Sequence, residues 1–178
     1  WDARESSWDF AKHPLVACRA SVTIKGSWKN YAVECAEVHA RVRELEERNN
    51  RLLIGAYGLG DELSPEVPAD QITLAHADRG EDMKRLVSYA VGCGMGRYSL
   101  AEPGLIYAES GAEGFDASRY TKFPATDRGI LVVTPDEWFE DDAANRFEEF
   151  LKVVWPEDTL EENLTFVADS LNPRKSDT

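Results

Sequence analysis

The chain has 178 residues, of which 43% are hydrophobic, and its 33 acidic and 20 basic residues give a formal net charge of −13 at pH 7. This length fits one domain, or one compact piece of a larger protein, with enough apolar residues for a core. The negative charge opposes non-specific binding to phosphate backbones, because like charges repel along the whole approach. Any contact with DNA would therefore have to be local.

The cysteines and histidines are few and scattered along the chain: Cys18, Cys35, Cys93, His13, His39 and His76. Their number and spacing suit neither a disulfide framework nor a paired-cysteine zinc site, which predicts a reduced, cytoplasmic protein. Cys35 and His39 stand one helical turn apart, but at least one further ligand would be missing. We therefore expect no metal in this chain.

The chain contains no apolar run long enough to cross a membrane, and its first ten residues lack a basic leader and an apolar signal core. We therefore expect no membrane partner. The sequence begins at Trp1 rather than at a methionine. This start suggests a segment of a longer parent.

The first strong pattern predicts a long helix over about residues 28 to 57. Apolar residues recur there at alternating steps of four and three, which places one narrow seam along the helix. The seam comprises Tyr31, Cys35, Val38, Val42, Leu45, Asn49, Leu52, Ala56 and Leu59. Asn49 either fixes the register of a coiled coil or faces water at its rim. We expect this helix to be a spine or to brace a neighbouring domain.

A second helix is predicted over residues 81 to 95, after a connector in which Pro65 and Pro68 prevent a regular helix. Its apolar stripe comprises Met83, Leu86, Val87, Ala90 and Val91. Gly92, Gly94 and Gly96 stand at its end. A dinucleotide-binding glycine loop instead follows a strand and opens a helix, and it has a different spacing. We expect close packing of another helix at Gly92 and Gly94 and a left-handed C-terminal cap at Gly96.

Two short strands are predicted next, at residues 102–108 and 128–134, and the residues between them form a long surface loop. Two capped helices should then close the chain. The first would open with the capping box of Thr134 and Glu137, with Pro135 at its first position, and the second with Thr159 and Glu162.

Candidate chemistry is sparse. The acidic run Glu140–Asp142 could supply paired carboxylates, but acidic residues are also expected near the start of a helix. Ser88, Ser99 and Ser110 lack the surrounding sequence of a nucleophile elbow. Arg97 and Tyr98, just past the glycines, could meet a phosphate or a base, or could simply pair with an acidic group and pack.

Four strings in the same order resemble one family: residues 7–10 (SWDF), 44–74 (ELEERNNRLLIGAYGLGDELSPEVPADQITL), 88–108 (SYAVGCGMGRYSLAEPGLIYA) and 136–155 (DEWFEDDAANRFEEFLKVVW). They resemble an internal region of the large PglX-type adenine-specific DNA methyltransferases of bacterial BREX and phage-growth-limitation systems. The resemblance covers most of residues 7 to 171.

The resemblance implies that the parent binds S-adenosylmethionine and methylates a flipped adenine. The Asn-Pro-Pro-Tyr motif of the catalytic core is absent from this chain. The chain would therefore lie C-terminal to that core, with no catalytic, cofactor-binding or metal-binding residue of its own. As weak candidates for DNA contact we name Arg97, Tyr98, Arg119 and Lys122.

The expected fold is α+β and mainly helical, with the long spine helix and three further helices around a small two- or three-stranded element. Residues 1–178 would be a single segment of a larger protein, with an N-terminal region (1–60), a middle region of connector, helix and strands (61–134), and two capped helices (135–172).

The expected role is to link the methyltransferase core to the DNA-recognition region, without methyl transfer by this segment alone. Its partners would be the rest of the parent, DNA through the parent and other defence-system proteins. The alternative is an acidic module that docks other defence-system proteins without touching DNA. A free-standing nucleotide-binding enzyme is disfavoured, because the order of helix and glycines is wrong for a phosphate loop.

Overall fold

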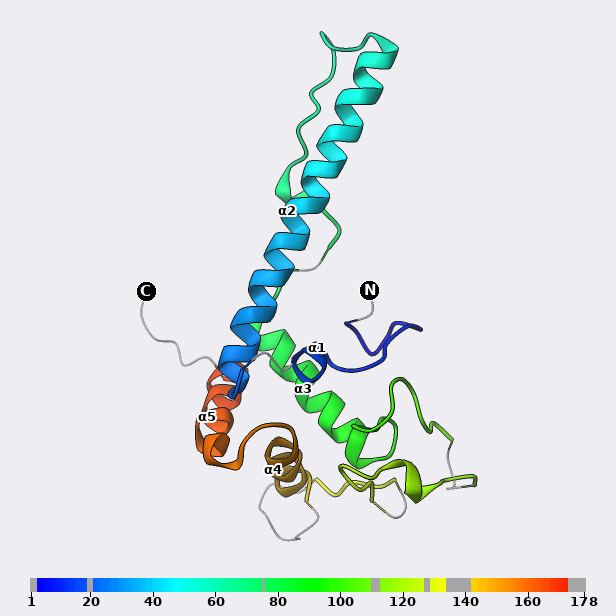
Figure 1. Cartoon of the computed structure of the whole chain (residues 1–178), viewed down its shortest axis with the longest axis vertical. Coiled ribbons are helices and arrows are strands. Elements are labelled where there is room, and N and C mark those ends of the chain that lie inside the picture. Colours follow the sequence, from blue (N-terminus) through cyan, green and yellow to red (C-terminus); the bar gives the residue numbers. More distant parts are fainter. Residues whose placement is uncertain are drawn as a thin grey trace. The chain divides into compact units, whose positions relative to one another are not determined.

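The computed structural model describes residues 3–18, 21–74, 76–109, 113–126, 129–133 and 142–172. The α-helices in these ranges are α1 (Pro14–Ala17), α2 (Ile24–Tyr57), α3 (Arg79–Gly94), α4 (Ala143–Val154) and α5 (Leu160–Leu171) (Figure 1). Short 3₁₀ helices are η1 (Ala69–Gln71), η2 (Ala117–Arg119) and η3 (Glu157–Thr159). The chain divides into two compact units: unit 1 comprises Trp1–Trp28 and Arg79–Thr178, and unit 2 comprises Lys29–Asp78.

The prediction of a small two- or three-stranded element is wrong, because the described residues contain no β-strand and only one isolated parallel bridge, between Val132 and Asp142. The backbone of each expected strand is engaged elsewhere. The Ile106 N–H donates to the Arg97 carbonyl at 2.8 Å, and the Ala143 N–H donates to the Val132 carbonyl at 2.8 Å. An apolar run becomes a strand only where another strand satisfies its polar groups, and these two runs instead join a loop and a helix start.

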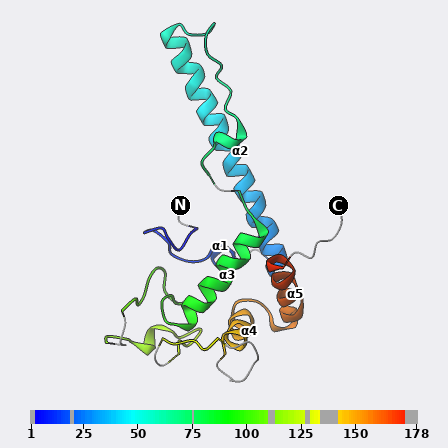
Figure 2. The same cartoon turned by 180° about the vertical axis from the view of Figure 1, so that it is seen from behind.

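The core of unit 1 lies where α3, α4 and α5 pack on one another (Figures 1 and 2). The predicted stripe of α3 supplies Met83 and Leu86, and α4 supplies Phe150 and Leu151, all at most 1% exposed. Burial of each such side chain contributes about 1.5–3 kcal/mol. The helix periodicity of the sequence therefore identifies this core.

The start of α2 is held by two different caps. Thr23 Oγ1 accepts a hydrogen bond from the Gly26 N–H at 3.1 Å. The Ile24 N–H donates at 2.8 Å to Oδ1 of Asn163, which lies on α5 and is 1% exposed. The Asn163 amide in turn donates to Thr159 Oγ1 at 3.0 Å. A side chain 139 residues away thus satisfies one of the helix's unpaired amides.

The last two helices start differently from the prediction. The proposed box at Thr134 and Glu137 lies outside the described residues, and α4 is capped by Asp142, whose Oδ1 accepts from the Ala144 N–H at 3.0 Å. Thr159 is at the N-cap of α5 but makes no side-chain capping bond. Its hydroxyl donates to the Pro156 carbonyl at 2.7 Å instead, so the second predicted capping box is wrong.

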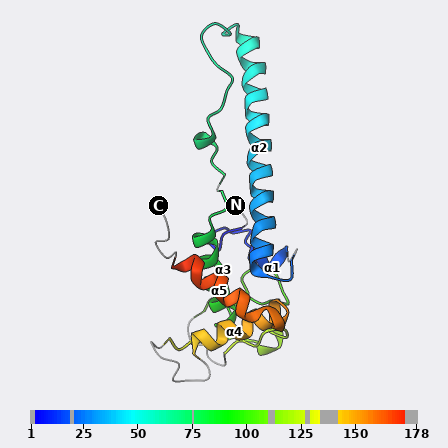
Figure 3. The same cartoon turned by 90° about the vertical axis from the view of Figure 1, so that its left-hand side faces the viewer.

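Unit 2 consists of most of α2 and the chain that returns along it (Figure 3). Asn50 Nδ2 donates to the Pro65 carbonyl at 3.3 Å, and the Val67 N–H donates to Glu47 Oε1 at 3.4 Å. This bond from Val67 is the main cause that lowers the pKa of Glu47. The connector also buries Val67 and Ile72, which are 7% and 6% exposed, so both polar and apolar side chains of the connector are engaged.

None of the helices in the described ranges combines the length and the apolar character that crossing a lipid bilayer requires.

His13 is a buried cap at the start of α1. It is 3% exposed, and its Nδ1 accepts from the Leu15 N–H at 3.3 Å. Burial, and then the nearby Arg85 guanidinium, lower its pKa from 6.5 to about 4, while a hydrogen bond with the Asp82 backbone acts in the opposite direction. His13 is therefore held neutral in the folded chain.

We expect Asn163→Ala to lower the free energy of unfolding by about 1–3 kcal/mol, because the buried Ile24 N–H would lose its acceptor. Asn30 lies exposed on α2 and serves as the control. Its replacement by Ala should change the stability by less than about 0.5 kcal/mol. Urea titration of both variants checks this. Equal, small effects would show that the Asn163 bond does not hold α2.

Stability should also fall with acid because of His13. The unfolded histidine takes up a proton below pH 6.5, whereas the folded one does so only near pH 4. Its contribution is therefore complete above the unfolded pKa and is lost as the pH falls toward the folded one. From pH 7 down to about pH 5, the wild-type chain should lose about 2 kcal/mol more than His13→Asn, which keeps a capping side chain. Parallel pH profiles of the two chains would contradict this account.

Candidate nucleic-acid interface

The glycine-rich segment ends helix α3, as predicted. Gly96 has φ of 77°, and its N–H donates to the Cys93 carbonyl at 3.1 Å. The Arg97 N–H donates to the Gly92 carbonyl at 2.8 Å. These two bonds around a left-handed glycine form a Schellman cap. The amides that a phosphate would need are thus used to close the helix, and Gly96 confirms the predicted C-terminal cap.

The other two glycines provide close contacts with loops, not with another helix. A Cβ at Gly92 would lie 2.7 Å from Cδ2 of Tyr98, and one at Gly94 would lie 2.8 Å from Cδ1 of Leu131. Both distances are shorter than carbon atoms tolerate. The absence of side chains here lets the chain after α3 fold back onto its last turn.

Carbonyl groups at the end of α3 also hold residues far along the chain. The Gly94 carbonyl accepts from the Thr126 N–H at 2.8 Å, and the Gly96 carbonyl accepts from the Tyr120 hydroxyl at 2.6 Å. The last carbonyls of a helix, such as that of Gly94, have no partner within it, and the Gly96 carbonyl belongs to the cap beyond the helix. Here they bring the segment 116–126 against the segment 96–102.

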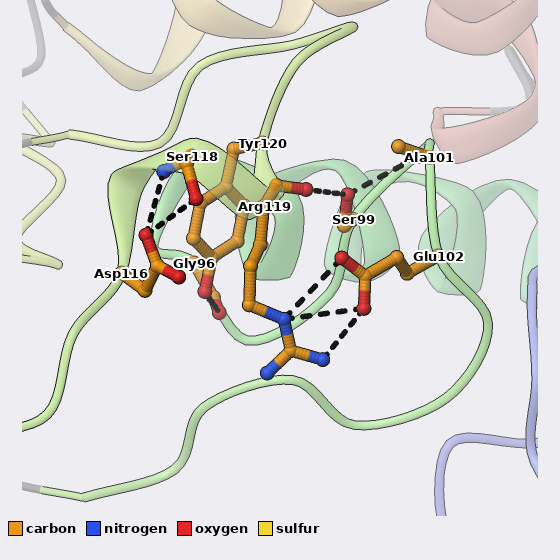
Figure 4. A network of polar contacts seen from close by, with 8 residues as sticks. All are labelled: Gly96, Ser99, Ala101, Glu102, Asp116, Ser118, Arg119 and Tyr120. Atoms are coloured by element: carbon orange, nitrogen blue, oxygen red, sulfur yellow. Dashed lines mark hydrogen bonds and ion pairs between the residues drawn. The ribbon is translucent and has the colours of Figure 1, made fainter.

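Figure 4 shows the polar network that joins these two segments. Ser99 Oγ donates to the Arg119 carbonyl at 2.8 Å, and the Arg119 guanidinium binds Glu102 through Nη2–Oε2 at 2.6 Å and Nε–Oε2 at 3.1 Å. Asp116 caps η2 by accepting from the Ser118 N–H at 3.0 Å and from its hydroxyl at 2.6 Å. The network fixes both segments as one surface.

The ionisation of this network follows from its contacts. The hydrogen bond from Arg119 is the main cause that lowers the pKa of Glu102, and the same bond raises the pKa of Arg119. The Ser118 hydroxyl lowers the pKa of Asp116 in the same manner. Glu102 and Arg119 therefore form a charged pair whose side chains are each 40% exposed.

The four candidate DNA-contact residues lie on the two segments that the network joins, but they differ in exposure. Arg97 and Lys122 are exposed, and Lys122 is flanked by the buried rings of Tyr120 and Phe123. The Arg119 guanidinium is engaged by Glu102. Tyr98 is 5% exposed. The two exposed cations are thus carried on anchored backbone.

Tyr98 belongs to an aromatic cluster. Its ring centroid lies 5.3 Å from that of Phe10 in an edge-on arrangement, and 5.3 Å from that of Tyr89 in a stacked one. Its hydroxyl donates to Glu5 Oε2 at 3.3 Å, and burial is the main cause that raises its pKa. In this arrangement the ring packs within the protein and offers no face to a base.

Sequence reasoning did not identify Glu102, Ser99 or Tyr120 as members of this surface. The Asp116-x-Ser118 spacing is a local turn signal that could have been read. The pairing of Glu102 with Arg119, 17 residues apart, had no such signal. Long-range pairs depend on where the chain returns, which single-sequence periodicity does not encode.

The other chemistry considered from the sequence takes structural positions. Asp142 is 2% exposed and caps α4, while Glu140 and Asp141 lie outside the described residues. The ring of His39 lies against that of His76, with centroids 4.1 Å apart and an angle of 35° between the ring planes. Within the described ranges, no three His, Cys, Asp or Glu side chains gather in a way that could hold a metal ion.

Comparison with known proteins shows two close relatives. The chain is 36% identical over 180 residues to the adenine-specific methyltransferase PglX of Lacticaseibacillus casei (strain Zhang), covering 98% of this chain. It is 34% identical over 190 residues to the adenine-specific methyltransferase BrxX of Escherichia coli O9:H4 (strain HS), covering 96% of this chain. This chain is homologous to the PglX-type adenine-specific methyltransferases. No family model matches it.

The relationship to PglX-type enzymes confirms the resemblance seen in the four sequence strings. The alignments span 15% of the PglX relative and 16% of the BrxX relative, so the chain corresponds to a small part of either protein. Because nearly the whole chain is aligned, both loop segments and the long helix belong to the shared region.

We expect Gly92→Ala to lower the free energy of unfolding by about 1–3 kcal/mol, because its Cβ would overlap the body of the Tyr98 ring. Gly55, inside α2, is the matched control, because a Cβ there would meet no neighbouring group within 4 Å. Gly55→Ala should raise the stability by about 0.5–1 kcal/mol. Thermal unfolding of the two variants shows whether each substitution raises or lowers the stability. A stabilised Gly92→Ala chain would show that Tyr98 does not depend on that glycine.

Proposed function

We propose that this chain is a non-catalytic segment of an adenine-specific DNA methyltransferase of a bacterial anti-phage system, and that it positions the methyltransferase core relative to the DNA-recognition region. The observation that carries the proposal is the similarity of nearly the whole chain to a small part of two adenine-specific methyltransferases. In this proposal, S-adenosylmethionine and the catalytic residues belong to other parts of the parent.

The contacts of the glycine segment support the proposal that the cofactor binds elsewhere in the parent. The N–H groups of Gly96, Arg97 and Tyr98 all donate to carbonyls of α3. A nucleoside or methyl-donor site at this loop would need such donors to be available. The segment therefore does not fit as a cofactor site, and we derive no methyl-transfer step from it.

The anchored surface at the end of α3 supports a positioning role. Arg97 immediately follows the cap glycine. Lys122 directly precedes Phe123 and comes two residues after Tyr120, and these two aromatic residues are each 3% exposed. Cations held on fixed backbone can meet phosphate oxygens and set the register of a duplex without reading its sequence. We propose Arg97 and Lys122 as phosphate contacts, and Arg119 and Tyr98 as residues that hold the loops that carry them.

The net charge of −13 limits what these contacts can do. Repulsion from the rest of the chain weakens free association with DNA, and added salt screens both this repulsion and the local attraction. Binding by the isolated chain should therefore be weak and salt-dependent, and it should strengthen when the parent brings the duplex to this surface.

The test is fluorescence anisotropy of labelled duplex DNA with the 178-residue chain at low and moderate salt. We expect Lys122→Ala and Arg97→Ala each to weaken binding and to reduce the slope of log K against log salt by about 1. Lys152→Ala, an exposed lysine on α4, is the matched control and should leave the slope unchanged.

The outcomes separate this proposal from the alternative. Absence of binding at every salt concentration would favour an acidic module that docks other defence-system proteins without DNA contact. Equal effects of Lys122→Ala and Lys152→Ala would remove the end of α3 as the contact surface. Transfer of methyl groups from S-adenosylmethionine to DNA by this chain alone would end the non-catalytic assignment.

A further inference from the structure

The apolar seam of α2 is exposed along much of its length, while Tyr31, Cys35 and Val42 are half-buried. We use the name α2 seam for the helical residues that recur at alternating steps of four and three: Tyr31, Cys35, Val38, Val42, Leu45, Asn49, Leu52 and Ala56. Val38 is 54% exposed, Leu45 46% and Leu52 65%. Monomeric proteins rarely leave a continuous apolar stripe uncovered. The seam therefore has the character of an interaction surface.

The rest of unit 2 covers a different face of α2. The connector contacts Asn50, Glu47 and His39, through Pro65, Val67 and His76 respectively. In heptad positions with Cys35 at a, these three α2 residues fall at b, f and e, whereas the α2 seam occupies a and d. Within the described part of unit 2, these three contacts lie beside or opposite the seam, and Val38, Leu45 and Leu52 remain exposed.

The side chains along the seam favour a second copy of the same helix. Val42 stands at an a position, and Leu45 and Leu52 stand at d positions. A β-branched residue at a with leucine at d favours parallel two-stranded coiled coils. We propose that the α2 seam binds the α2 seam of a second copy of this chain, in a parallel and in-register pair.

Asn49 fixes the register of such a pair. It occupies an a position, so in a parallel, in-register dimer it faces Asn49 of the second copy, and the two amides can hydrogen-bond to each other. Any shifted register would place this amide against an apolar side chain without a partner, which is costly. The polar interruption thus selects one alignment at some expense of stability.

One pair of flanking charges agrees with the same alignment. Arg41 is at a g position and Glu46 at the following e position, and these positions face each other across a parallel coiled coil. In the single chain, Arg41 pairs with Glu44 at 2.6 Å, with side chains 62% and 67% exposed. Such an exposed pair holds its partners weakly. Arg41 can therefore turn to Glu46 of the second copy.

The first test measures mass against concentration by sedimentation equilibrium. The wild-type chain should approach twice its monomer mass as the concentration rises from low to high micromolar. Val38→Asp, on the seam, should weaken association at least tenfold. Val33→Asp is the matched control, because Val33 is 57% exposed on the same helix but at an f position. Circular dichroism of both variants confirms that the helices remain folded.

The second test uses the chain's own cysteine to read the direction of pairing. Cys35 is at an a position, so in a parallel, in-register pair the two Cys35 residues are close enough for a disulfide. Mild oxidation of a Cys18→Ser chain, which lacks the exposed cysteine, should give a covalent dimer. The Cys18→Ser/Cys35→Ser chain should remain monomeric on a non-reducing gel.

Three results would overturn the proposal. A wild-type chain that stays monomeric at every concentration would assign the seam to a helix elsewhere in a longer polypeptide. Equal weakening by Val33→Asp and Val38→Asp would place the interface off the seam. A dimer without the Cys35 cross-link would be antiparallel or out of register. None of these outcomes depends on binding to DNA, so they are independent of the proposed function.

Discussion

The last carbonyl groups of α3 are the constraint on which the rest of the candidate interface depends. A helix end must find donors outside its own ladder. Here the donors come from Arg97 and Gly96 in the cap and from Thr126, 32 residues after Gly94, while the Tyr120 hydroxyl binds the carbonyl of the cap glycine. The described parts of these loops contain only the short helix η2, yet their backbone is held, and their exposed cations are placed by contacts at one helix terminus.

The helices could be predicted from the sequence because their signals are local. The stripe of α3 and the glycine that ends it follow from spacing and from the permitted φ of glycine. The strands could not be predicted in this way. The run at 130–133 is apolar, yet Ile130 and Val133 are 64% and 79% exposed. A short apolar run identifies a strand only when its pairing partner is known.

The sequence of the long helix predicts its apolar seam but not the partner of that seam. Its spacing predicts that an apolar seam exists, and α2 carries it. The spacing does not say what covers the seam, and within unit 2 the connector binds through Glu47 and Asn50 instead. The caps show the same limit. Asn163 caps the start of α2 although it lies 139 residues from Ile24 in the sequence, and no local motif predicts this contact.

The contacts of Arg119 with two neighbouring residues affect how mutations in these loops would be interpreted. Its carbonyl is bound by Ser99 and its guanidinium by Glu102, so a defect at any of the three disturbs the surface that carries Arg97. A screen for loss of DNA binding, the role proposed for this surface, would recover architectural and contact positions together. Separate measurements of folding and of nucleic-acid affinity would distinguish the architectural positions from the contact positions. Replacement of Arg119 by lysine, which keeps the charge, would count as an architectural defect.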